Sequence, residues 1–233
     1  MARVWVGTSG FSYKEWKGTF YPPELPDRGM LAFYASRFRA VEIDSTFYRM
    51  PSQKTLEAWR ASTPEDFRFT LKASQQITHR QRLQVPSTSL TYFTSLLPSL
   101  GARLGLVLYQ LPPFFKCDTT RLRAFLEVLP PEITACFEFR HPSWFVPEIY
   151  ALLESRRVVL CINDSPEGCS PMEITSSATY VRLRRDGYTA EQREEWRMRW
   201  RDWARAGTEV FAYIKHKDNP DAPHIALDFA KDF

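Results

Sequence analysis

The most chemically suggestive segment of this chain is Ala135-Cys-Phe-Glu-Phe-Arg-His-Pro-Ser-Trp-Phe145. Glu138 and Arg140 alternate with Phe137 and Phe139, and the period of two in a strand places the charged pair on one face and the phenylalanines on the other. A carboxylate inside a sheet is costly unless it is paired, so a charge retained there is typical of catalysis or binding. A purely structural Glu–Arg pair is the alternative that this segment alone leaves open.

Short apolar runs alternate with longer amphipathic segments along the whole chain, and these predict the elements that position the pair. Strands are expected at 4–8, 40–45, 67–73, 105–111, 133–140, 158–163, 179–184 and 210–215, with helices at 29–38, 53–61, 90–100, 119–129, 146–155, 190–205 and 222–231. The Pro/Gly/Ser-rich link 165–171 should lack a full helix. Alternating strands and helices require a parallel sheet. Eight such units favour a closed (β/α)8 TIM-type barrel, one domain spanning residues 1–233.

Strands of such a barrel direct one face to the helices and the other to the barrel axis. The more uniformly apolar face should meet the helices, which directs inward a set of charged and amide residues: Glu42, Asp44, Arg68, Lys72, Gln110, Glu138, Arg140, Asn163, Arg182, Arg184 and Lys215. Most of these lie near the carboxyl ends of their strands, where barrel enzymes place their sites. Glu42 and Arg68 lie deeper and are expected to be structural. The sequence therefore predicts a functional pocket at that end.

The candidate catalytic residues are Glu138, Lys72, His141, His79 and Asp44. Glu138 is the expected general acid or base, because apolar walls raise the pKa of a carboxyl group while Arg140 or Lys72 limits the shift. The two histidines could exchange protons near neutral pH. Lys72, Arg182 and Lys215 would hold a carboxylate, phosphate or developing oxyanion. The residues expected to bind substrate are Thr8, Ser9, Tyr13, Gln110, Arg140, Trp144, Asn163, Arg182, Lys215 and His216.

The first loop allows two interpretations. Gly7-Thr-Ser-Gly10 could cradle an anion with its backbone N–H groups, although a tight turn explains it equally well. The aromatic residues that follow could form a stacking wall over the site or a hydrophobic cluster that anchors the loop: Tyr13, Trp16, Phe20 and Tyr21.

A divalent metal is an alternative, because His79, His141 and His216 follow strand ends and could join Asp44, Glu138 and Asp164 as ligands. No H-x-H or H-E-x-x-H spacing supports a metal site, and the inward lysines and arginines would repel a cation. We therefore expect a proton-transfer and anion site without a metal or cofactor.

Composition restricts the class of protein. The net charge of +4 over 233 residues tolerates an anionic substrate, but is far from the basic balance of a dedicated nucleic-acid binder. The four cysteines contain no C-x-x-C pair and are expected to be reduced thiols. No signal-peptide pattern and no run long enough to span a bilayer is found, so the expected location is the cytoplasm.

Five motifs in order resemble the YecE-like family, catalogued as domain of unknown function 72. They are Gly7-Thr-Ser-Gly-Phe-Ser-Tyr13 with Trp16 and Phe20-Tyr-Pro22, Val41-Glu-Ile-Asp-Ser-Thr-Phe-Tyr48, Phe69–Ala73 with Ile77-Thr-His79, Gln110-Leu-Pro-Pro113, and Glu138-Phe-Arg-His-Pro-Ser-Trp144. The resemblance implies a TIM-type barrel and supplies no established reaction. The ends of the seventh and eighth strands, Arg182-Leu-Arg-Arg-Asp186 and Ile214-Lys-His-Lys-Asp218, depart from the pattern of many members, so substrate preference does not transfer.

The leading interpretation is a barrel enzyme that uses acid/base chemistry on a small polar or anionic substrate, with hydrolysis, elimination and isomerisation all open. The alternative is a non-catalytic barrel that binds a metabolite or nucleic acid. The oligomeric state is not indicated by the sequence.

Overall fold

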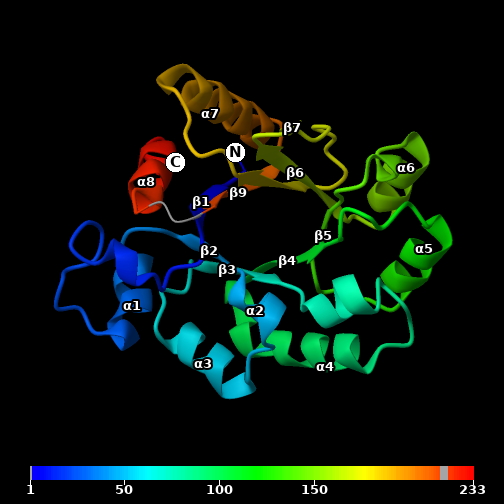
Figure 1. Ribbon diagram of the computed structural model, residues 1–233, viewed down its shortest axis with the longest axis horizontal. Helices are drawn as coiled ribbons and strands as arrows, with labels where there is room; N and C mark the ends of the chain where they lie inside the picture. Colours follow the sequence, from blue (N-terminus) through cyan, green and yellow to red (C-terminus); the bar gives the residue numbers. More distant parts are fainter. Residues whose placement is uncertain (1, 216–219) are drawn as a thin grey trace.

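The computed structural model describes residues 2–215 and 220–233, and its centre is a closed parallel barrel (Figure 1). The eight barrel strands are β1 Val4–Ser9, β2 Ala40–Ile43, β3 Arg68–Lys72, β4 Leu104–Gln110, β5 Ala135–Glu138, β6 Val159–Ser165, β8 Ala178–Leu183 and β9 Glu209–Lys215. They pair in the order β5-β4-β3-β2-β1-β9-β8-β6, and pairing of β5 with β6 closes the ring. The predicted TIM-type barrel is confirmed.

Helices surround the strands on the outside (Figure 1). The α-helices are α1 Met30–Ala35, α2 Ser45–Tyr48, α3 Gln53–Ala61, α4 Thr88–Leu96, α5 Thr119–Glu127, α6 Pro147–Ser155, α7 Ala190–Arg205 and α8 Ala222–Ala230. Short 3-10 or π segments lie at Lys14–Trp16 (η1), Asp27–Gly29 (η2), Gln76–Arg80 (η3), Leu97–Arg103 (η4) and Pro142–Trp144 (η5). Between β6 and β8 the chain forms β7, Gly168–Cys169, which pairs antiparallel with β6. As predicted, this link is not a full helix.

Capping side chains fix the starts of several outer helices. The Ser52 and Asp118 side chains accept backbone N–H bonds at the first turns of α3 and α5. Thr189 and Gln192 form a reciprocal capping box at the start of α7. Each such cap satisfies backbone donors that have no partner within the helix and contributes about 1 kcal/mol.

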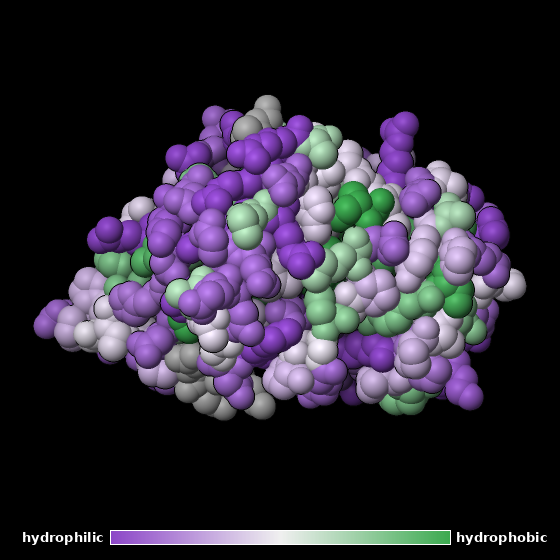
Figure 2. Space-filling view, turned by 90° about the horizontal axis from the view of Figure 1, so that it is seen from above, coloured by the Kyte–Doolittle hydropathy of each residue, from purple (hydrophilic) through white to green (hydrophobic). Residues whose placement is uncertain are grey.

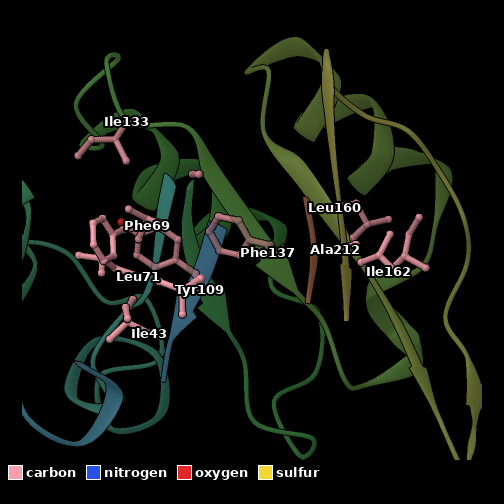
Figure 3. Close-up of a cluster of buried hydrophobic side chains, with 14 of the residues drawn as sticks. Ile43, Phe69, Leu71, Tyr109, Ile133, Phe137, Leu160, Ile162 and Ala212 are labelled. Atoms are coloured by element: carbon pink, nitrogen blue, oxygen red, sulfur yellow. The ribbon is translucent and has the colours of Figure 1, made fainter. Parts of the chain in front are cut away.

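The main hydrophobic core lies between the strands and the helices. Figure 3 shows side chains from adjacent strands gathered on the outer face of the barrel, among them Phe69, Tyr109 and Phe137. The rings of Tyr109 and Phe137 stack with their centroids 5.3 Å apart. Ile162 and Ala212 belong to the same layer. This confirms the sequence expectation that the uniformly apolar faces of the strands meet the helices.

A second, smaller apolar cluster fills the inside of the barrel below the polar site. Its members are Trp5, Ala40, Leu106, Leu108, Cys136, Val159, Cys161, Ala178, Tyr180, Phe211 and Tyr213. All four cysteines are free thiols, as predicted, and Cys136 and Cys161 are buried in this cluster. The charged residues above it therefore rest on a closed hydrophobic floor.

The seam between β1 and β2 depends on a tyrosine from α1. The two strands are in register at Ser9 and Glu42. Further down, the Tyr34 hydroxyl accepts a bond from the Thr8 backbone N–H at 2.8 Å and donates to the Ala40 carbonyl at 3.1 Å. The seam admits no side chain at Gly7, where a Cβ atom would lie 2.1 Å from the Ala40 carbonyl oxygen. This close approach fixes Ser9 directly above it.

The outer face of α7 carries charge, as its sequence indicates. Trp196 and Trp200 are buried against the core, whereas Arg201 pairs with Glu194 at 2.9 Å and with Asp232 at 2.6 Å. Figure 2 looks onto this side of the molecule and shows hydrophilic residues over the helix. These exposed pairs keep the helix solvated and contribute little stability.

Candidate active site

The centre of the candidate site is a guanidinium held between two buried carboxylates. Arg182 Nη2 lies 2.7 Å from Glu42 Oε1, and its Nη1 lies 2.6 Å from Glu138 Oε2. All three side chains are at most 1% exposed. They reach the barrel axis from β8, β2 and β5, on the inward faces that the strand period predicts. A buried ion pair of this kind holds its members in one geometry.

Glu138 accepts hydrogen bonds from four side chains. Besides Arg182, the donors are Gln110 at 2.8 Å, Arg140 at 3.0 Å and Arg184 at 3.4 Å. Burial alone would raise the pKa of Glu138, but the guanidinium groups outweigh it and hold the pKa well below its usual range. The expectation that apolar walls raise this pKa is therefore wrong. Glu138 stays ionised at any physiological pH and is suited to positioning the arginines.

The pKa values of Glu42 and Asp44, two residues apart, are shifted in opposite directions. Glu42 accepts a bond from Ser9 Oγ at 2.5 Å and another from the Tyr180 hydroxyl. Burial raises the pKa of Glu42, and Arg182 offsets this only in part. For Asp44, burial is outweighed by Arg182 and Lys72, which lower its pKa. Asp44 is thus the carboxylate that remains ionised where the site opens to solvent.

Lys72 forms the wall of the site next to Asp44. Its Nζ lies 3.8 Å from Asp44 Oδ1 and 4.2 Å from the centre of the Phe47 ring. Burial lowers the pKa of Lys72, and Asp44 opposes that effect. The position of Asp44 follows from α2, which begins one residue after it: the Thr46 hydroxyl donates to the Lys72 carbonyl at 2.7 Å and ties α2 to the end of β3. Strand β2 therefore ends earlier than predicted.

His79 lies in η3 beside this wall. Its ring centre is 4.9 Å from that of Phe47, and its Nδ1 is 2.9 Å from the Thr78 hydroxyl. Burial lowers the pKa of His79, and the charges of Lys72 and Arg140 act in the same direction. The imidazole is therefore neutral at pH 7 and could accept a proton.

A cavity of about 480 Å³ opens beside the network, between the ends of β5, β6, β8 and β9. Its lining residues are Pro113, Phe139, Arg140, Phe145, Asn163, Ser165, Pro166, Glu167, Ser170, Arg184, Asp186 and Lys215. Burial, together with Arg184 and Arg182, lowers the pKa of Lys215 to about 8. A separate hollow of about 130 Å³ lies between Tyr13 and Asp44. The larger cavity is thus lined by three cations, the carboxylates of Glu167 and Asp186, apolar rings and hydroxyl groups.

Two residues that were expected to bind substrate, Thr8 and Trp144, do not face the site. Thr8 faces the helices and bonds Tyr34 and the Gly10 carbonyl. Trp144 is fully buried, stacks on Phe139 and donates to the Phe115 carbonyl at 2.7 Å, so its ring is not available to a ligand. Thr8 serves packing because its side chain is on the face of β1 that meets the helices. Trp144 does so because η5 turns its ring onto Phe139.

Other predicted residues lie in or near the site, and several of them hold neighbouring side chains in place. Ser9 is buried and holds Glu42, and Gln110 holds Glu138. His141 caps η5, where its Nδ1 lies 2.8 Å from the Ser143 hydroxyl. Asn163 lines the large cavity, whereas Tyr13 lines the small hollow and donates to the Ser9 carbonyl at 2.8 Å. The neighbouring rings form the loop-anchoring cluster: Trp16, Phe20 and Tyr21. His216 lies outside the described residues.

In the part of the chain that the structure describes, no group of three or more His, Cys, Asp or Glu side chains is placed to hold a metal ion. Asp164, one of the carboxylates considered as a ligand, faces α7 and pairs with Arg185 at 2.7 Å. It lines neither the large cavity nor the hollow beside Asp44.

Two contributors to the site were not among the candidate site residues, Arg184 and Tyr180. Tyr180 and Arg184 lie two residues before and two residues after Arg182. The period of two in a strand therefore already indicated that they point the same way as Arg182. Ser165, at the end of β6, also lines the cavity. Phe145 and Ser170 line it as well, and they come from loops whose course a strand pattern does not give.

The comparisons with known proteins agree on one family. Residues 5–233 match the model of a family described as "Protein of unknown function DUF72". The UPF0759 protein YunF of Bacillus subtilis is 27% identical over 94% of this chain and 90% of its own length. The UPF0759 protein YecE of Escherichia coli K12 is 34% identical over 48% of this chain and 42% of its own length.

Solved structures share the barrel. A crystal structure of a DUF72 family protein from Thermotoga maritima superposes with a TM-score of 0.85 at 28% identity, covering 98% of both chains. A D-psicose 3-epimerase from Clostridium cellulolyticum reaches a TM-score of 0.56 at 12% identity over 99% of this chain and 96% of its own, which is a likeness of fold alone. No helix within residues 2–215 and 220–233 is long and apolar enough to cross a membrane.

Proposed function

This chain belongs to the DUF72 family, and we propose that it is an enzyme that performs acid/base chemistry on a small anionic substrate at the carboxyl end of its barrel. One observation carries the proposal. Of the charged side chains that line the large cavity, three are cationic, Arg140, Arg184 and Lys215, and two are carboxylates, Glu167 and Asp186. The excess positive charge favours an anion in the cavity.

The anionic group of the substrate would lie against Arg140, Arg184 and Lys215. All three line the large cavity, and its volume of about 480 Å³ lies in the range usual for small-molecule sites. Arg140 and Arg184 are themselves fixed by Glu138 at 3.0 and 3.4 Å, so little side-chain entropy is lost when they bind a ligand. Glu138 and Arg182 thus act as positioning residues beneath the binding surface.

Proton transfer would fall to the groups at the rim. Asp44 is ionised and its side chain is 26% exposed, which suits a general base. Lys72, with its lowered pKa, is 3.8 Å away and can return the proton. Neutral His79 is an additional acceptor. Hydrolysis, elimination and isomerisation all use such a pair.

The proposal is tested by ligand capture followed by turnover. Purified protein is incubated with a metabolite extract, washed by ultrafiltration, and its bound compounds are identified by mass spectrometry. We expect enrichment of an anionic metabolite by the natural protein and by Asp44→Asn, and not by Arg184→Met. The natural protein should convert that metabolite at least a hundredfold faster than Asp44→Asn.

Arg205→Met serves as the control, because Arg205 is an exposed residue of α7 that pairs with Asp202. Its capture and turnover should match those of the natural protein. Specific capture without turnover would contradict the enzyme and favour the non-catalytic binding barrel. Undiminished capture by Arg184→Met would contradict the assignment of the anion site.

A further inference from the structure

Lys215 is the last residue of β9 and points into the large cavity. Phe211 and Tyr213 belong to the interior cluster, whereas Ala212 and Ile214 belong to the outer core, so the strand period directs Lys215 inward. It lines the cavity together with Arg140 and Arg184. Its backbone is in register with Ser9 of β1, which fixes the base of the side chain on the barrel.

The two lysines of the site differ in their partners. Lys72 lies 3.8 Å from Asp44 and over the Phe47 ring. Within residues 2–215 and 220–233, the Lys215 side chain forms no ion pair and no hydrogen bond. The charges of Arg184, Arg182 and Lys72 lower its pKa, and the charge of Asp44 opposes them. Burial and the neighbouring guanidinium groups favour the neutral form of this amine, which is the nucleophilic one.

We infer that Lys215 is a nucleophile that forms a Schiff base with an anionic aldehyde or ketone held in this cavity. This inference rests on the proposed function and narrows its substrate to carbonyl compounds. The neutral amine attacks the carbonyl carbon, and one proton passes from nitrogen to the former carbonyl oxygen. A second proton from solvent converts that hydroxyl group into water, which leaves, so that a protonated C=N bond remains.

A negatively charged substrate would compensate the positive charge of the site. The Schiff base keeps a positive charge at Lys215 beside Arg184, and a carboxylate or phosphate on the same molecule would compensate it. The protonated C=N bond then withdraws electrons from the adjacent carbon, where Asp44 could remove a proton. Among the reaction types open to this site, the inference favours elimination and isomerisation over hydrolysis.

The protonation of Lys215 sets the size of the expected effect. With a pKa of about 8, about a quarter of its amine groups are neutral at pH 7.5, against roughly 0.1% for an ordinary lysine with a pKa near 10.4. The ratio is about two hundredfold. Because nucleophilicity falls with pKa, we expect a smaller gain in rate, of at least tenfold.

Reductive trapping tests the inference directly. The full chain is incubated at pH 7.5 with glyoxylate and cyanoborohydride, and each lysine is quantified by peptide mass spectrometry. Glyoxylate should label Lys215 at least tenfold faster than Lys54, an exposed lysine of α3 that serves as the internal reference. With propionaldehyde, a neutral aldehyde, the preference should fall several-fold. Lys215→Arg should remove the fast label, and Lys54→Arg should not.

Sulfate separates the failure of this inference from failure of the proposed function. Sulfate should protect Lys215 from glyoxylate and raise the melting temperature of the natural protein more than that of Arg184→Met. Equal labelling of Lys215 and Lys54, with the sulfate effect intact, would overturn the nucleophile while the anion site stands. Preferential labelling of Lys72 would also overturn it. Absence of both the labelling and the sulfate effect would overturn the inference and the proposed function together.

Discussion

Replacing Arg182 with methionine should destabilise the folded protein, because it leaves two buried carboxylates without their shared cation. Arg182 makes bonds of 2.7 Å to Glu42 and 2.6 Å to Glu138, and its side chain is 1% exposed. Each charge-assisted bond of this kind contributes about 1.5–3 kcal/mol. Breaking a buried pair by removing one partner costs about 3–5 kcal/mol, because the remaining charge has no solvent.

For a chain of this length, that cost corresponds to a decrease in melting temperature of roughly 6–20 °C. We expect an intermediate loss for Arg182→Lys, because one ammonium group cannot bridge both carboxylates in the way that the two guanidinium nitrogens do. Arg205→Met is the control, since Arg205 and Asp202 are 62% and 71% exposed. It should change the free energy of unfolding by less than about 0.5 kcal/mol.

The effect should depend on pH with a defined sign. The pKa of Glu138 is lowered in the folded state, so its stabilising contribution is present above the pKa of an unfolded glutamate, about 4.3, and is lost as the pH falls. In Arg182→Met, Glu42 and Glu138 lose a cation and can take up protons instead. The difference between the two proteins should therefore narrow by about 1–2 kcal/mol between pH 7 and pH 3.5.

Guanidinium unfolding followed by circular dichroism at both pH values measures these differences. A loss below about 1 kcal/mol at pH 7 would refute the view that Arg182 neutralises this site. A difference that widens as the pH falls would refute the ionisation state assigned to Glu138.

Three further outcomes are expected. Gly7→Ala should cost about 3 kcal/mol in thermal unfolding, because its Cβ would meet the Ala40 carbonyl at 2.1 Å, whereas Gly187→Ala, with open space around it, should be neutral; equal values would refute the tight seam. Trp144→Phe should lower the free energy of unfolding by about 1–2 kcal/mol, because the hydrogen bond to Phe115 is lost, and should leave phosphate affinity unchanged. Weaker phosphate binding would indicate that Trp144 contacts the ligand. NMR titration should find the pKa of His79 below the ordinary histidine value and higher in Lys72→Met, because burial and then Lys72 lower it; an unchanged value would contradict that cause.

The fold was predictable from the sequence because its signal is local. Most strands are short apolar runs followed by an amphipathic segment, and eight such units favour a closed barrel. The inward direction of Glu138 and Arg182 was equally predictable, since the period of two cannot change within a strand. The same period of two also indicates that Tyr180 and Arg184 point inward.

The chemistry of Glu138 was not predictable from its own segment. Its pKa depends on Arg182 of β8 and on Arg184 just after that strand, more than forty residues along the chain. Only the closed barrel sets their distances from Glu138. Trp144 was misassigned for a related reason. It follows the strand in a short 3-10 turn, which rotates its ring onto Phe139, and such a turn leaves little pattern in the sequence.

Isothermal titration with inorganic phosphate at low ionic strength tests the central claim, a fixed anion site at the mouth of the barrel. We expect one saturable site per chain, with affinity at least tenfold weaker in Arg184→Met and unchanged in Arg205→Met. Absence of saturable binding, or equal affinity in all three proteins, would contradict the account.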